Sequence, residues 1–154
     1  MPIFYLPDKS ADVWGGAVAE GMAKRDPVLG PLDVIAHAAL AIGDDVTHLR
    51  DLGRPQLALY IGGMGARGRN FYNDLVRRYG YEAAAKSIQD LYLAGKKDEA
   101  AAAVPDALVD EVALCGPKER IRERLQIWKS SGVTTLICGV GQLEALRLMA
   151  ELAL

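Results

Sequence analysis

Two residue types that often build metal and catalytic sites are scarce in this chain. Its 154 residues include two cysteines, Cys115 and Cys138, and two histidines, His37 and His48. The cysteines do not form a Cys-x-x-Cys pair, and no histidine stands at metal-ligand spacing from them, so we predict no metal site. The pattern favours two buried, reduced thiols in a cytoplasmic protein over a disulfide or a catalytic thiol.

An excess of one charge and long apolar runs are also missing. The formal net charge is −2, which gives no reason to expect nucleic acid or an anionic membrane as a partner. The longest apolar stretch, residues 34–42, is interrupted by His37 and is too short to cross a bilayer. No charged segment followed by an apolar one opens the chain, as a secretion signal would. With 51% hydrophobic and 25% charged residues, we expect one globular domain over residues 1–154.

Apolar patterning divides the chain into strands and helices. Runs of β-branched and apolar residues predict strands over residues 3–6, 32–42 and 133–138. Periodicity, caps and breakers predict helices over residues 8–24, 44–52, 70–79, 82–94, 106–114, 117–131 and 142–154, with a short Ala-rich helix before Pro105. The second helix is expected to end before Pro55, since proline disfavours helix in the residue before it.

The order of these elements predicts an α/β fold with parallel strands. Strand and helix alternate, and a long helical excursion comes before the last strand. Parallel strands are normally covered on both faces and flanked on both sides, whereas a closed (β/α)₈ barrel takes about 250 residues. The chain is therefore expected either to be a fragment or to complete its sheet in a homo-oligomer, most simply a dimer. The strand over residues 3–6 would then be covered by another copy.

Three stretches together resemble one protein family. They are residues 2–6 (PIFYL), residues 60–81 (YIGGMGARGRNFYNDLVRRYGY), and residues 116–125 (GPKERIRERL) with the following SGVTTL of residues 131–136. This combination is similar to the luciferase-like monooxygenase family, in the branch that uses the deazaflavin coenzyme F420. The resemblance covers most of this chain but only the C-terminal portion of the family's usual length.

The resemblance implies a partial TIM-type (β/α) barrel of an oxidoreductase. Such a barrel would bind F420, or FMN as the alternative, and transfer hydride between the ring and a small-molecule substrate. The family's usual acid/base and most of its cofactor contacts come from earlier strands, so no catalytic residue is carried over to this chain. A non-catalytic homo-oligomeric remnant that binds no cofactor by itself is the alternative in a different class.

A glycine-rich loop at residues 63–68 (GMGARG) is the first candidate site. It formally matches G-x-G-x-x-G, in which backbone N–H groups and a helix N-terminus bind a pyrophosphate, so an NAD(P)-binding protein is a further alternative. The strand that should follow the helix is replaced by a second helix. A flexible loop is the simplest interpretation, and a loop in which Arg67 and Arg69 bind anionic groups beside Gly63 and Gly65 is the functional one.

The second candidate site follows the predicted strands. Gly139 and Gly141 come directly after the last predicted strand, where many TIM barrels bind phosphate, although a tight strand-to-helix turn is the simpler interpretation. Asp44 and Asp45 after the preceding strand would repel phosphate and more simply cap a helix. His37 lies in mid-strand, where a satisfied core histidine is the simpler interpretation and a donor to a bound ring is the functional one.

Overall fold

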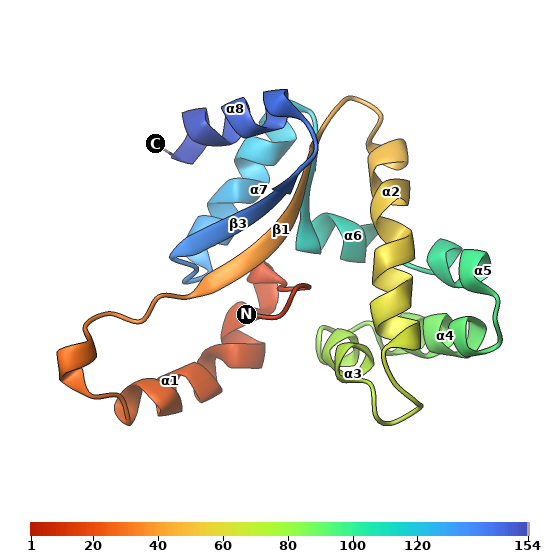
Figure 1. Cartoon of the computed structure of the whole chain (residues 1–154), viewed down its shortest axis with the longest axis horizontal. Coiled ribbons are helices and arrows are strands. Elements are labelled where there is room, and N and C mark those ends of the chain that lie inside the picture. Colours follow the sequence, from red (N-terminus) through yellow and green to blue (C-terminus); the bar gives the residue numbers. More distant parts are fainter. Residues whose placement is uncertain (154) are drawn as a thin grey trace.

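The computed structural model describes residues 1–153 of the chain (Figure 1). Short 3₁₀ or π turns are labelled η. In chain order the elements are η1 (Pro7–Lys9), η2 (Ala11–Gly15), α1 (Gly16–Ala23), η3 (Pro27–Leu29), β1 (Ile35–Ile42), α2 (Val46–Ala58), η4 (Leu59–Gly63), α3 (Phe71–Arg78), α4 (Glu82–Leu93), α5 (Lys97–Ala102), α6 (Asp106–Val112), β2 (Ala113–Gly116), α7 (Lys118–Ser130), β3 (Thr135–Val140) and α8 (Leu143–Ala153).

The strands form a parallel sheet with β1 at its centre, in the order β2-β1-β3. Ala39–Ile42 of β1 pair with Ala113–Gly116 of β2, and Ile35–Leu40 pair with Thr135–Val140 of β3. The helices from α2 to α6 form the long excursion between β1 and β2, and Figure 1 places them to one side of the sheet. The predicted fold class, α/β with about three parallel strands and a helical excursion, is confirmed.

The prediction of a strand over residues 3–6 is wrong. Within the described residues this segment joins no sheet, and its side chains instead divide between the two hydrophobic cores. Phe4 and Leu6 pack with the excursion helices, whereas Tyr5 packs beneath the sheet and donates a hydrogen bond to the Ser131 carbonyl at 3.0 Å. A four-residue run between prolines can form few ladder hydrogen bonds, so side-chain burial decides its position.

A strand that the sequence does not predict takes its place. Residues 106–114 read as one helix, but α6 ends at Val112 and the next four residues form β2. Leu114 and Cys115 pair opposite Leu40 and Ala41 of β1. The cause is this long-range pairing, which overrides the local preference of a short apolar run.

The predicted break at Pro55 is also wrong. α2 continues through the proline to Ala58, and the π turn η4 follows it directly. Proline removes one helical hydrogen bond, but Leu57, Ala58 and Ile61 are all buried in the excursion core. Burial of this apolar stretch against α3, α4 and α6 offsets the lost bond.

The two faces of the sheet have different surroundings. Ala36, Ala38 and Leu40 are buried against α7 and α8, and α7 contributes Ile121, Leu125 and Trp128 to this core. The opposite face, which we call the open face, carries Ile35, His37, Ala39, Ile137 and Gly139. Near β3 the open face is bare, since Ile35 is 42% exposed and Ile137 is 52% exposed.

Asp110 of α6 joins three helices through ion pairs. Its carboxylate accepts hydrogen bonds from Arg50 of α2 at 2.7 and 2.9 Å and lies 2.7 Å from Arg120 of α7. Burial alone would raise the pKa of Asp110, but the bonds from the two arginines outweigh it and hold this pKa below its ordinary value. The excursion is therefore fastened to α7 by a partly buried charge.

We expect Asp110→Asn to lower the free energy of unfolding by about 2 kcal/mol at pH 7, the usual size of a lost charged hydrogen bond. Because the folded pKa of Asp110 is depressed, its contribution is present above the unfolded value near pH 4 and is lost as the pH falls through the folded pKa. Urea unfolding of both proteins at pH 7 and near pH 3 measures this. The exposed Asp98→Asn is the control; a gap between wild type and Asp110→Asn that does not shrink in acid would contradict the expectation.

Candidate functional site

His37 is the third residue of β1 and lies on the open face, beside β3. A Cβ placed on Gly139 would lie 3.4 Å from both Cε1 and Nε2 of the imidazole, so glycine at this position leaves room for the ring. The side chain is half-buried, and the described part of the chain offers it no hydrogen-bond partner. His37 is therefore only partly enclosed, and its role as a donor to a bound ring stays a prediction.

A cavity of about 200 Å³ separates His37 from the excursion. Its lining is mainly apolar and includes Phe4, Ala39 and Leu57, while Gln56 and Tyr60 add polar groups from α2 and η4. An apolar hollow with a few converging polar groups is the usual form of a small-molecule site.

A groove of about 550 Å³ lies at the carboxyl ends of β1 and β3. After β1 the chain continues into α2 on the open face, whereas after β3 it continues into α8 on the other face. Because the two connections run to opposite faces, a crevice opens between the strand ends. Gln142 bridges them: its Oε1 accepts from the Ile42 N–H at 2.8 Å, and its Nε2 donates to the Ile42 carbonyl at 2.9 Å. The Gln142 amide therefore fixes the geometry of the groove floor.

The groove is lined by acidic and neutral groups. Asp44, Asp45 and His48 face Gly141 and Gln142 across it, and no lysine or arginine contributes to the described lining. The Asp45 carboxylate accepts from the His48 N–H at 3.0 Å and caps α2, so the predicted capping role is confirmed for this residue. This charge gives no support to phosphate binding at Gly139 and Gly141.

The glycine-rich loop lies far from the strand ends. It follows the far end of α2, whose 13 residues make a helix about 20 Å long. None of its predicted site residues Gly63, Gly65, Arg67 and Arg69 contributes to the lining of the cavity beside His37 or of the groove at the strand ends. A helical turn precedes the loop where a dinucleotide fold needs a strand, so the structural context of the NAD(P) motif is missing.

Contacts with other parts of the chain explain the position of most of this loop. The guanidinium of Arg67 pairs with the Asp90 carboxylate of α4 at 2.8 Å, and the Gly65 carbonyl accepts from Gln89. A Cβ on Gly63 would lie 2.4 Å from the Tyr92 ring. Gly63 therefore allows close packing against α4, and Gly65 allows the loop to approach its own backbone at Arg69, whose side chain is exposed.

Two buried asparagines, which the sequence analysis did not single out, hold the loop in place. Asn70 caps α3 and donates to the carbonyls of Tyr60 and Ile61 at 2.9 and 3.0 Å. Asn73 donates to the Ile61 and Ala85 carbonyls at 3.0 and 2.7 Å. The position of Asn70 before an apolar-periodic helix is a capping signal that could have marked it; Asn73 carries no such signal.

The remaining candidate residues are structural or peripheral. Cys115 and Cys138 are both free and lie on strands that flank β1, and burial raises the pKa of each thiol, which disfavours a reactive thiolate. His48 and Phe71 are both exposed and do not belong to the core. Trp128 is a core residue.

Two kinds of feature are not found in residues 1–153. No three side chains of His, Cys, Asp or Glu gather there as they would around a metal ion. Among the same residues, no helix combines the length and apolar character needed to span a membrane.

The parallel sheet with helices packed on it matches part of a TIM-type α/β barrel of known structure. Residues 1–135 match the model of the luciferase-like monooxygenase family, and the chain belongs to this family. A Mycobacterium tuberculosis protein assigned as a coenzyme F420-dependent oxidoreductase is 36% identical over 154 residues, which is 99% of this chain.

Solved structures support the fold. The coenzyme F420-dependent tetrahydromethanopterin reductase of Methanopyrus kandleri superposes with a TM-score of 0.60 and 16% identity over 86% of this chain. The chain spans 44% of the mycobacterial relative and 37% of the reductase chain, less than half of each.

Proposed function

We propose that this chain forms one wall of the cofactor site of an F420-dependent oxidoreductase, with His37 as its ligand-facing residue. The observation that carries the proposal is the unpartnered His37 imidazole beside Gly139 on the open face. The relative assigned as F420-dependent supports the choice of a deazaflavin over FMN.

The residues around His37 suit a planar ring. Ala39 and Gly139 are small and exposed next to the imidazole, so this part of the open face is flat. When bound there, F420 would supply hydride transfer at its deazaflavin ring. His37 would donate or accept a hydrogen bond at a polar ring atom, and the apolar neighbours would exclude water from one side of the ring.

We expect saturable F420 binding that His37→Ala weakens tenfold or more, equivalent to about 1.4 kcal/mol. F420 fluorescence is titrated against the chain alone and against the chain mixed with the part of the mycobacterial relative that it does not match. His48→Ala is the matched control, because His48 lines the groove at the strand ends instead of the open face.

Other outcomes assign the chain differently. Equal weakening by His37→Ala and His48→Ala would move the ligand into the groove and overturn the role of His37. Saturation by NAD alone would favour the dinucleotide alternative. No saturation by F420, FMN or NAD in either sample would leave a non-catalytic remnant and end the proposed function.

A further inference from the structure

We propose that Gln142 is a positioning residue for the site around His37. Its side-chain amide takes the place of a strand residue opposite Ile42 and holds the end of β3 against β1. The inference rests on the proposed function, because it concerns how the Gly139 side of the His37 site is fixed. It adds a residue at the strand ends that acts through the backbone of β3.

Backbone pairing between β1 and β3 stops before β1 ends. The last pair is Leu40 with Val140, and the same register would place Ile42 opposite residue 142. In a regular parallel ladder the N–H and C=O of Ile42 would bond to backbone groups of the neighbouring strand. Because β3 ends at Val140, its backbone has already left the sheet at this point.

The Gln142 amide supplies both missing bonds. Its Oε1 accepts from the Ile42 N–H at 2.8 Å, and its Nε2 donates to the Ile42 carbonyl at 2.9 Å. A primary amide offers an acceptor and a donor, as a peptide group does, so one side chain satisfies both backbone groups. At the other end of β3 the Val34 N–H donates to Thr134 Oγ1 at 2.8 Å. Side-chain hydrogen bonds therefore terminate the β1–β3 pairing at both ends.

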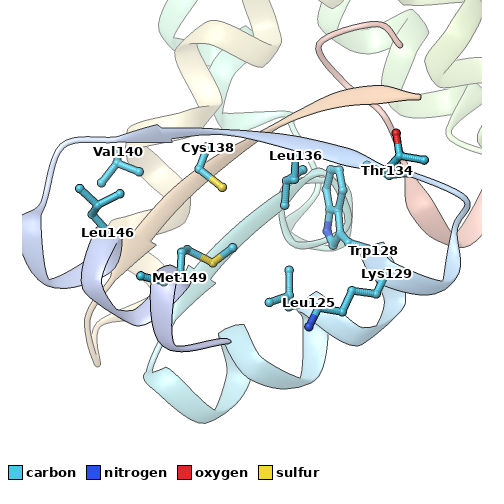
Figure 2. Close-up of a pocket in the computed structure, with 11 residues that line it drawn as sticks. Leu125, Trp128, Lys129, Thr134, Leu136, Cys138, Val140, Leu146 and Met149 are labelled. Atoms are coloured by element: carbon cyan, nitrogen blue, oxygen red, sulfur yellow. The ribbon is translucent and has the colours of Figure 1, made fainter. Parts of the chain in front are cut away.

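Packing contributes little to the position of β3. None of its six residues is fully buried, and among residues 1–153 no strand pairs with its outer edge. Figure 2 shows Leu136, Cys138 and Val140 pointing into a groove of about 550 Å³ between β3, α7 and α8. Because this space behind the strand is not filled, hydrogen bonds to β1 are what fix the end of β3.

The end of β3 carries one wall of the His37 site. Gly139 lies between Cys138 and Val140 in sequence and therefore faces the opposite side, which is the open face. There an added Cβ would lie 3.4 Å from the imidazole. Gln142 follows three residues later, about 10 Å along an extended chain. Fraying that begins at Gln142 would thus move Gly139 away from His37.

Gln142→Glu tests the role because its hydrogen bonding changes with pH. The protonated carboxyl has a donor and an acceptor and restores both bonds, whereas the carboxylate cannot donate and repels the Ile42 carbonyl. At about pH 7.5 we expect tenfold faster hydrogen exchange at the Ile42 amide, a shifted His37 Cε1–H signal in NMR spectra, and at least threefold weaker F420 binding. At about pH 4.5, near the ordinary pKa of glutamate, most of each difference should disappear.

Three comparisons make the result specific. Asp44, Asp45 and His48 also line the groove at the strand ends and titrate themselves, so wild type at the same pH is the reference. Gln126→Glu makes the same change at an exposed position of α7 and should have no effect. Gln142→Met removes both hydrogen bonds without adding a charge, so its effects should be equal at both pH values. Circular dichroism verifies that the variants fold.

The outcomes separate this role from the proposed function. If wild type binds no F420 but the His37 signal still follows Gln142→Glu with pH, the proposed function fails and the positioning role is kept. If wild type binds F420 but the variant changes neither the His37 signal nor the affinity, the positioning role is overturned. Faster exchange at Ile42 without any change at His37 would assign Gln142 to local stability alone and would also overturn it.

Discussion

Replacing Trp128 with alanine should lower the free energy of unfolding by about 3 to 5 kcal/mol, the usual range for a large buried aromatic side chain. Trp128 is 1% exposed and packs from α7 against the sheet, with its ring centroid 5.7 Å from that of Tyr5. Because Tyr5 anchors the N-terminal segment through Ser131, the cavity would loosen that segment as well. Guanidinium unfolding followed by far-ultraviolet circular dichroism measures the loss without relying on tryptophan fluorescence.

Trp128→Phe is the matched control. The indole N–H of Trp128 is buried and has no hydrogen-bond partner in the described part of the chain. Phenylalanine keeps most of the apolar contact and removes this unpaired donor, so we expect a cost of about 1 kcal/mol. If both variants lost the same unfolding free energy, the filled volume would not be what stabilises the core. The indole N–H would then stabilise it through a hydrogen bond.

Elements with strong local signals could be predicted from the sequence. The helices near residues 70–79 and 82–94 appear as α3 and α4, and Gly80 and Gly95 end them with φ of 95° and 82°. These boundaries depend on caps and on left-handed glycines, both of which act within one turn of the chain.

Elements that depend on distant partners could not be predicted. Ala113–Gly116 is a strand only because Ala39–Ile42 lies beside it, about seventy residues earlier in the chain. The segment over residues 3–6 has the composition of a strand, but its side chains pack into two different cores, Ile3, Phe4 and Leu6 into one and Tyr5 into the other. Composition identifies a β-prone run, whereas pairing needs a neighbour that no local pattern specifies.

The candidate site, too, could be predicted from the sequence only in part. Alternation along β1 indicates that His37 and Ala39 share a face, but it cannot show that Gly139 lies beside the imidazole. The glycine-rich loop contains the most conspicuous motif, yet Gly63 serves a contact with α4 and Gly65 a contact with the backbone of the loop itself. A glycine motif indicates that another group lies close to the backbone. At Gly63 that group is the side chain of Tyr92 and not a ligand.

Gly62→Ala tests this explanation of the loop and should cost about 3 kcal/mol of unfolding free energy, the upper part of the range for overpacking. A Cβ on the buried Gly62 would lie 2.4 Å from the Tyr92 Cβ and 3.1 Å from the Ile88 carbonyl oxygen. Both atoms are fixed by the backbone of α4, so the clash cannot be relieved by a rotamer change. Urea unfolding of the variant measures the cost.

Two further alanine variants make the result specific to that contact. At Gly63 the clash is with the far end of the Tyr92 ring, which can swing away, so Gly63→Ala should cost less than Gly62→Ala. At Gly16 in α1 an added Cβ meets nothing within 4 Å, and Gly16→Ala should stabilise the chain by up to about 1 kcal/mol through helix propensity. If Gly62→Ala were as stable as wild type, the glycines would not be needed for packing on α4, and a ligand-binding role for the loop would have to be reconsidered.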